Sequence, residues 1–378
     1  MIGQKGIATS AGGVEKHVEE ISMRLVKEGH QVTVYYRDTF MKKNMKEYKG
    51  IRLIKIKTFK FKSLDAIVYT LKATANALYN NYEVYHYHAL GPASLSFIPK
   101  LFQKKVIVTV HGLDWKRDKW GKFGKAYLKF GEFIVGNFSD RVICVSDNIR
   151  KYLVCKYKKR DDLNTIFIPN GVNIEEGIGA SLIKRYKLKE NDYILFLARL
   201  VPEKGAHYLI QSYNQLNIDV KLVIAGGDSF TKKYMKYLRS LSRGNDNIIF
   251  TGNVSGQLLN ELYTNCLFYV LPSDIEGMPL SLLEALSYGK YCVTSDIDEN
   301  KSVINYDILG TTFIKGNVDS LKNKILLTLS SDSYKKNSEE RKKYIKERYN
   351  WNESTYSTEA VYNSLFSKTE KIKCNEVT

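Results

Sequence analysis

The sequence predicts an α/β protein made of two doubly wound parallel sheets, each with a Rossmann-like order of strands and helices. Short β-branched and aromatic runs alternate with amphipathic helical stretches along most of the 378 residues, the pattern of parallel sheets that are covered by helices on both faces. The alternation is interrupted at the Gly-rich, acidic stretch 173–181, which we interpret as a linker. With 44% hydrophobic and 26% charged residues, the chain has the composition of a packed globular protein rather than a disordered one.

The first half reads as one strand-and-helix series. After Gly12 and Gly13, apolar residues recur at helical spacing, Gly29 supplies a C-terminal stop, and 31–36 follows as a strand. We expect further strands at 83–88, 105–110 and 141–146. A helix is expected over 120–138, and a strand followed by a turn at 167–172. We therefore predict an N-terminal domain over residues 1–172.

The second half repeats the pattern. Its strands are predicted at 193–198, 221–226, 247–252, 267–272 and 290–295, separated by helical segments. These form a C-terminal domain over 173–350. The pattern of residues 351–366 predicts an amphipathic helix that follows a highly charged one. We expect the last eleven residues, 368–378, to form a frayed tail. The segment 351–378 is thus a third part of the chain.

Charge and cysteine content narrow the classes of protein. Of the net charge of +18, residues 1–170 carry +16 and the remainder +2, so an acidic partner is expected on the first half. The five cysteines are odd in number and contain no C-x-x-C pair, which argues against a disulfide framework and a zinc cluster and favours a reducing cytoplasm. No apolar run approaches the roughly 18 residues of a membrane span.

The clearest candidate site is EGMPLSLLEAL, where Glu276 and Glu284 stand eight residues apart around a turn that becomes a helix. Pro279 suits the first helical turn. We then expect the backbone N–H groups of Gly277, Met278 and Leu280 at a phosphate-binding helix start, with Pro279, which has no N–H, between them. Carboxylates placed on either side suit sugar or ribose hydroxyls. The alternative is two surface glutamates on an ordinary helix.

A second motif, LARLVPEKG, places Arg199 just after a strand and Lys204 at the next helix start. Ligands of open α/β sheets bind at such carboxyl ends of strands. An arginine fork with a nearby ammonium suits a diphosphate whose negative charge grows as it departs. Ordinary surface charges are the alternative interpretation.

The first half offers weaker signals. Gly12 and Gly13 stand at a helix start, where a backbone can approach an anion closely, although the motif is neither G-x-G-x-x-G nor a Walker loop. His111 directly follows a strand, and its alternative role is a core or capping histidine. His86 and His88 share one face of a strand, but without a third ligand at suggestive spacing we favour packing or a contact with the acceptor over metal binding.

Residues 115–133 interleave six basic residues with aromatic ones, including Phe123 and Phe130. This composition suits an anionic membrane surface. Nucleic acid binding, or a solvated basic helix with its aromatic face in the core, fits the same composition.

Taken in order, the motifs resemble the retaining glycosyltransferases of family four, the group 1 type with the GT-B fold. The shared segments are GQKGIATSAGGVEKHVEE, HALGPA, VTVHGLDWKR, FIPNGV, LARLVPEKG, IAGGDS and EGMPLSLLEAL, which span residues 2 to 366. Only Met1 and Ile2 precede Gly3, where the family begins with a full strand. Either the start is misassigned or the first strand is very short.

The resemblance implies a nucleoside-diphosphate sugar in a central cleft that the two domains face. It implies that Arg199 and Lys204 hold the diphosphate, Glu276 contacts donor sugar hydroxyls, Glu284 holds the ribose and His111 contacts the donor sugar. Gly12 and Gly13 would lie near the phosphates, and Gly277, Met278, Pro279 and Leu280 would line the donor site. No metal and no cofactor are implied, and the donor is a UDP-sugar or GDP-sugar. The last helix is expected to cross back to the N-terminal domain.

The resemblance also implies that the basic first domain takes the acceptor. We therefore predict a hexosyltransferase-like enzyme of cell-surface polysaccharide biosynthesis, peripheral at the cytoplasmic face of the membrane, with a lipid-linked or glycan acceptor, an anionic membrane surface and no nucleic acid as partners. The alternatives are a basic nucleic-acid-binding protein and a nucleotide-sugar epimerase on the same fold.

Overall fold

The computed structural model describes residues 1–7, 12–41, 45–58, 64–157, 164–174, 178–227 and 232–366. It divides into two compact units. Unit 1 comprises Met1–Trp115, Trp120–Pro169 and the chain from Asn352 on; unit 2 comprises Lys116–Lys119 and Asn170–Trp351. Among the described helices, none has both the length and the apolar character needed to span a bilayer.

Unit 2 contains a six-stranded parallel sheet in the order β10-β9-β8-β11-β12-β13. The strands are β8 (Tyr193–Leu197), β9 (Lys221–Ala225), β10 (Ile248–Gly252), β11 (Tyr269–Leu271), β12 (Cys292–Ser295) and β13 (Gly310–Phe313). Counted along this unit, the order is 3-2-1-4-5-6, so the chain reverses direction across the sheet between β8 and β11. Open sheets bind ligands beyond the strand ends at such a switch point.

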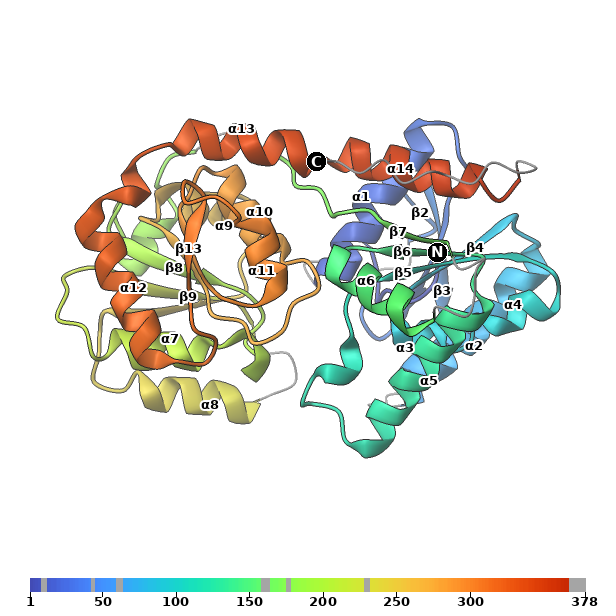
Figure 1. Ribbon diagram of the computed structural model, residues 1–378, viewed down its shortest axis with the longest axis horizontal. Coiled ribbons are helices and arrows are strands. Elements are labelled where there is room, and N and C mark those ends of the chain that lie inside the picture. The colour runs from blue at the N-terminus through green and yellow to red at the C-terminus, as the bar shows by residue number, and fades with distance from the viewer. Residues whose placement is uncertain are drawn as a thin grey trace. The chain divides into compact units, whose positions relative to one another are not determined.

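Helices cover both faces of this sheet (Figure 1). One face packs against α7 (Ala206–Tyr213), α8 (Lys232–Leu241) and α12 (Val318–Ser331). The other packs against α9 (Gln257–Asn265), α10 (Leu280–Ser287), α11 (Asp298–Val303) and α13 (Ser338–Arg348). Both faces of the strands are consequently apolar, and residues such as Leu195 and Phe196 are fully buried on opposite sides.

Unit 1 contains a parallel sheet in the order β4-β5-β6-β7 and a three-stranded sheet in the order β1-β3-β2. The bounds are β1 (Thr33–Arg37), β2 (Glu47–Tyr48), β3 (Ile51–Ile56), β4 (Val84–His88), β5 (Lys105–Val110), β6 (Arg141–Cys144) and β7 (Asn164–Phe167). Met1 and Ile2 lie between them: Tyr35 N–H donates to Met1 O at 3.1 Å, and Ile2 N–H donates to His86 O at 2.9 Å. Met1 and Ile2 therefore link β1 to β4 through these hydrogen bonds and an isolated bridge of Ile2 to Tyr87, and they form no strand of their own.

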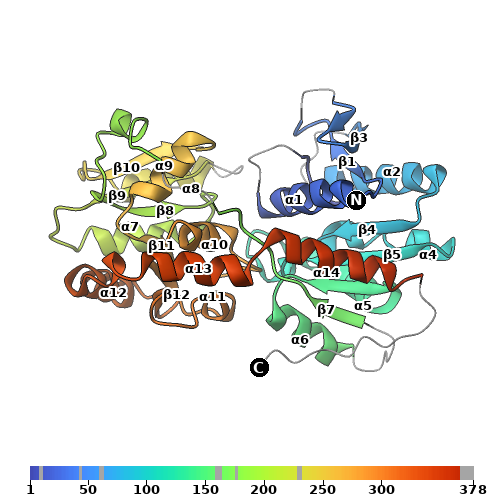
Figure 2. The same cartoon turned by 90° about the horizontal axis from the view of Figure 1, so that it is seen from above.

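The helices of unit 1 include α14 (Trp351–Asn363). Its Val361, and Leu365 in the turn that follows the helix, pack on the sheet beside Ile107 and Ile143. Figure 2 shows α14 running along this sheet. The others are α1 (Gly13–Lys27), α2 (Leu64–Asn80), α3 (Leu90–Ala93), α4 (Phe97–Leu101), α5 (Lys122–Phe138) and α6 (Asp147–Lys156). Of the short 3-10 helices, η1 (Asp114–Lys116) begins in unit 1, whereas η2 (Ile183–Tyr186), η3 (Pro202–Lys204) and η4 (Ser333–Lys335) belong to unit 2.

The fold class predicted from the sequence is confirmed, with two differences in the elements. The strand expected at 167–172 lies earlier, because β7 ends at Phe167 and Pro169 has no N–H to donate to a ladder. The hairpin β2–β3 and strand β13 were missed. The predicted linker lies in part at 175–177 and the predicted frayed tail wholly at 368–378, outside the described residues.

Candidate functional site

The loops that follow β8 and β11 meet at the switch point of unit 2. Gly205 stands in this contact with φ +69°, and a Cβ there would lie 2.0 Å from Pro272 O, so only glycine permits the approach. Asp274 N–H donates to Glu203 O at 2.9 Å across the same junction. The segment that carries Arg199 and Lys204 is thereby fixed against the segment that carries Glu276.

Lys204 Nζ and Glu276 Oε1 form an ion pair between these loops. The two side chains are only 15% and 7% exposed, so the interpretation of Glu276 as a surface glutamate is wrong. Burial lowers the pKa of Lys204, Glu276 raises it in part, and the positive charges of Arg199 and Arg117 lower it further. The site therefore concentrates positive charge around one buried carboxylate.

Arg199 lies two residues beyond the end of β8 and is half-buried. Its backbone carbonyl accepts a hydrogen bond from Val201 N–H at 3.0 Å. Within the described residues, no hydrogen bond or ion pair engages its guanidinium. This fork of donors is thus available to an anion beside Lys204.

Glu276 and Glu284 lie on either side of the start of α10. Pro279 is the N-cap of α10 (φ −78°, ψ 96°) and not a residue of its first turn, so the predicted helix start is one position too early. Gly277 is buried, and Met278 Sδ accepts from Asn170 N–H at 3.1 Å. The expected role of the N–H groups of 277–280 in phosphate binding stays a prediction.

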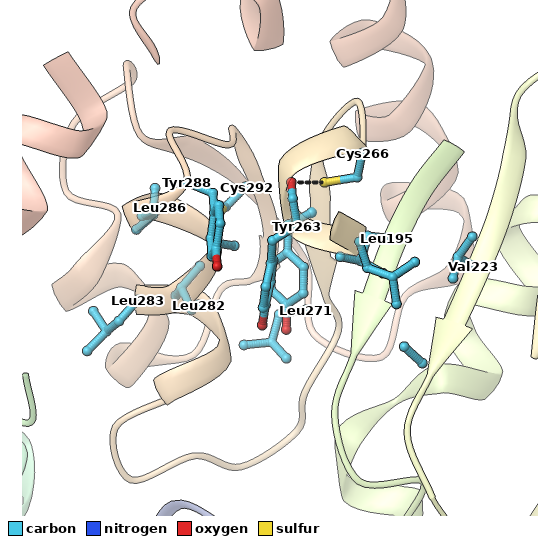
Figure 3. Packing of buried hydrophobic residues seen from close by; sticks show 14 of the residues in the cluster. Leu195, Val223, Tyr263, Cys266, Leu271, Leu282, Leu283, Leu286, Tyr288 and Cys292 are labelled. Atoms are coloured by element: carbon cyan, nitrogen blue, oxygen red, sulfur yellow. Dashed lines mark hydrogen bonds between the residues drawn. The ribbon is translucent and has the colours of Figure 1, made fainter. Parts of the chain in front are cut away.

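Tyr263 holds Glu284 and was not recognised in the sequence. Its ring, from α9, stacks on Tyr288 at 5.3 Å within the apolar core of unit 2, as Figure 3 shows. Its hydroxyl donates to Glu284 Oε2 at 3.1 Å. Burial and the charge of Glu284 raise the pKa of Tyr263 well above its usual value, so the phenol keeps its proton and remains a donor.

The remaining predicted residues lie in unit 1. Gly12 is the N-cap of α1 and Gly13 its first residue, while residues 8–11 of the same loop lie outside the described part. His111 follows β5 directly, and its Nε2 lies 3.2 Å from His88 Nδ1. Burial lowers the pKa of both imidazoles well below the usual value, so they are neutral at physiological pH.

The basic and aromatic segment forms η1 and most of α5. Tyr127 points inward and its hydroxyl donates to Gly91 O at 3.0 Å. Phe123, Phe130 and Phe133, in contrast, are 94%, 46% and 50% exposed. The interpretation of this helix as one with its aromatic face in the core is therefore wrong for these three rings.

Comparison with known proteins identifies the family. Residues 11–176 match the family described as Glycosyltransferase Family 4, and residues 181–351 match Glycosyl transferases group 1. An uncharacterised glycosyltransferase of Methanocaldococcus jannaschii is 25% identical over 363 residues, covering 94% of this chain and 95% of the relative. A UDP-Gal:alpha-D-GlcNAc-diphosphoundecaprenol alpha-1,3-galactosyltransferase of Escherichia coli is 30% identical over 234 residues, 58% of this chain and 59% of that one.

Solved structures agree on the fold. Sucrose-phosphate synthase of Thermosynechococcus elongatus superimposes with a TM-score of 0.82 at 19% identity, covering 96% of this chain and 95% of that one. HepE of Anabaena, in complex with UDP and glucose, gives 0.79 at 17% identity, covering 95% and 98%. With its two Rossmann-like units and matches to both family descriptions, the chain belongs to the group 1, family 4 glycosyltransferases and has the GT-B fold.

Proposed function

We propose that this glycosyltransferase transfers a sugar from a nucleoside-diphosphate sugar to a glycan acceptor, with retention of anomeric configuration and without a metal ion. The observation that carries the proposal is the buried Lys204–Glu276 pair at the switch point of unit 2, with the Arg199 guanidinium beside it, which no described residue engages in a hydrogen bond or ion pair. A guanidinium and an ammonium match the two phosphates of the donor.

Each side chain has a role in this proposal. Arg199 and Lys204 bind the diphosphate and stabilise the charge that grows on it as it leaves. Glu276, oriented by Lys204, accepts hydrogen bonds from donor sugar hydroxyls. Glu284, oriented by Tyr263, accepts from the ribose. The predicted contacts of His111, Gly12 and Gly13 with the donor stay predictions.

The chemical step needs no nucleophile from the protein. The acceptor hydroxyl attacks the anomeric carbon on the face from which the diphosphate leaves, and a departing phosphate oxygen takes the hydroxyl proton. The new C–O bond forms as the C–O bond to phosphate breaks, so the products are the glycoside and UDP or GDP. Arg199 and Lys204 supply the positive charge that a metal ion supplies elsewhere.

The acceptor proposal is a lipid-linked glycan at the cytoplasmic face of the membrane, in cell-surface polysaccharide assembly. Two relatives support it by name: the E. coli galactosyltransferase acts on a diphosphoundecaprenol-linked sugar, and a Staphylococcus aureus relative is a capsular polysaccharide biosynthesis glycosyltransferase. The exposed rings of Phe123, Phe130 and Phe133 on α5, with exposed Lys122 and Lys129, support binding to anionic lipid.

The test is a product analysis with radiolabelled UDP-sugars and GDP-sugars, with and without polyprenyl-diphosphate-sugar acceptors, in the presence of a chelator. Transfer to the acceptor with an unchanged anomeric configuration is expected. Inversion at the anomeric carbon would refute retention, and a requirement for added metal would refute the metal-free step. Conversion of the nucleotide sugar without an acceptor would instead identify an epimerase.

A further inference from the structure

Unit 1 contains a cluster of histidines that the proposed transfer reaction does not account for. Four of the six histidines in the sequence lie together there, namely His17, His86, His88 and His111. They come from three different elements: α1, strand β4 and the residue after β5. We propose that His17, His88 and His111 form a binding site for a divalent transition-metal ion such as Zn²⁺.

The spacing of the three imidazoles fits one ion. One nitrogen of each lies within 4.8 Å of one nitrogen of both others. His88 Nδ1 and His111 Nε2 are 3.2 Å apart, close to the roughly 3.4 Å that separates two nitrogens of a tetrahedral zinc site with Zn–N bonds of about 2.0–2.1 Å. The ring of His17 stands edge-on to His111, with centroids 4.7 Å apart.

The chemistry of the group selects the ion. All three ligands are imidazoles and no carboxylate belongs to the group, which favours Zn²⁺, Co²⁺, Ni²⁺ or Cu²⁺ over Mg²⁺ and Ca²⁺. His17 and His88 are 2% and 0% exposed. Among the described residues, His88 Nε2 is buried without a hydrogen-bond partner. Because the spacing assigns Nδ1 as the ligand atom of His88, this Nε2 carries the ring proton, and a neutral imidazole is the form that binds a metal ion.

His86 supports the triad without being a ligand. Its Nδ1 lies 2.7 Å from Tyr362 Oη on α14, and its Nε2 lies 2.7 Å from Thr109 Oγ1. Both of its nitrogens are therefore engaged. Its ring stacks on His88 with centroids 4.3 Å apart and limits the rotation of that ring. Three ligands leave a fourth position open for water or another group.

An occupied triad has a consequence for catalysis that, unlike the site itself, rests on the proposed function. His111 is predicted to contact the donor sugar. An ion that binds His111 competes with this contact, so micromolar Zn²⁺ is expected to inhibit transfer and a chelator to restore it. If Zn²⁺ binds to the wild type but does not inhibit transfer, the predicted role of His111 is wrong, whereas the metal site itself is not affected by this result.

The site itself is tested by metal binding to the full chain after removal of metals with a chelator. Zn²⁺ is titrated by calorimetry against the wild type and the His17→Gln and His88→Gln variants. His207→Gln is the matched control, because His207 lies in unit 2, where its Nδ1 is 2.9 Å from Tyr234 Oη. One equivalent should bind the wild type and the control, with affinity reduced about a hundredfold or more in both triad variants.

Co²⁺ provides a readout that does not depend on the folding of any variant. The wild type should give the visible absorption of tetrahedral Co²⁺ with nitrogen ligands, which Zn²⁺ abolishes. A thiolate-to-Co²⁺ charge-transfer band would assign the ion to a cysteine and overturn the proposal. Absence of stoichiometric Zn²⁺ binding, or equal affinity in a folded His88→Gln variant, would overturn it as well.

Discussion

Lys204 and Glu276 pair across the switch point of unit 2, although 72 positions separate them in the chain. Neither side chain can reach its partner unless the loops after β8 and β11 are in contact, and the contact at Gly205 provides this. The pair therefore links the packing of unit 2 to the chemistry proposed for it. Each charge orients the other while the donor is absent.

Loss of Lys204 should destabilise the protein as well as impair turnover. The Lys204→Ala variant leaves the Glu276 carboxylate buried without its partner, and such a loss costs about 3 kcal/mol. Lys221→Ala is the control, because Lys221 pairs with Asp192 where both side chains are about a quarter exposed, and its removal should cost about 0.5 kcal/mol. Urea unfolding measures both. Equal destabilisation of the two variants would contradict the buried character of the Lys204 pair.

Donor binding should weaken at alkaline pH. The pKa of Lys204 is lowered by burial and by Arg199 and Arg117, against the opposing effect of Glu276. The ammonium is charged below this pKa and neutral above it, so affinity for a diphosphate is present at neutral pH and lost as pH rises. The midpoint should lie below the value of about 10.4 for free lysine.

The Lys204→Arg variant is the control for this pH dependence, since a guanidinium does not lose its proton in the same range. UDP affinity, measured by calorimetry in buffers of increasing pH, should fall in the wild type and stay level in the variant. The same loss in both proteins would assign the titration to another group.

Tyr263 should act on the donor through Glu284. In the Tyr263→Phe variant the hydrogen bond to Glu284 Oε2 is lost, so the KM for the donor should rise roughly 3- to 10-fold while kcat changes little. Tyr269→Phe is matched to it, because the Tyr269 hydroxyl donates to Leu197 O and lies 2.8 Å from Ser281 Oγ, with no carboxylate involved. An equal change of KM in both variants would mean that Tyr263 acts only through packing.

The exposed phenylalanines of α5 should control binding to lipid. The double variant Phe123→Ser, Phe130→Ser should bind vesicles of anionic lipid roughly tenfold more weakly for each ring removed, with an unchanged melting temperature because both rings are exposed. Tyr79→Ser, which removes a ring that is 90% exposed on α2, should leave binding unaffected. Flotation measures both. Equal partition into neutral vesicles would argue against an electrostatic contribution.

The sequence predicts the buried parallel strands well because each is a continuous apolar run. The expected strand at 193–198 corresponds to β8 (Tyr193–Leu197), and that at 105–110 to β5. Strand β13 has no such run: it reads Gly-Thr-Thr-Phe, and its Gly310 passes so near Cys292 O that a Cβ would lie 2.1 Å away. Its position depends on packing against β12, which local sequence does not encode.

The same limit applies to the candidate site. Arg199 and Lys204 were recognised in the segment LARLVPEKG, and Glu276 in the segment EGMPLSLLEAL, because each segment stands at or after the end of a predicted strand. The support of Glu284 by Tyr263 was not, because Tyr263 has the spacing of an ordinary core residue on α9. His17 was likewise missed, since only the packing of α1 against the sheet brings it near His88. Contacts between distant segments are the part that pattern alone leaves undetermined.

The most direct test of the central claim is nucleotide binding at Arg199. Calorimetric titration of UDP and GDP into the wild type without metal should show one site, and the Arg199→Ala variant should lose most of this affinity while its melting temperature without ligand stays unchanged. Arg243→Ala, at an exposed position after α8, should bind like the wild type. Undiminished binding of the nucleoside diphosphate to the Arg199→Ala variant would contradict the assignment of the donor site to the switch point of unit 2.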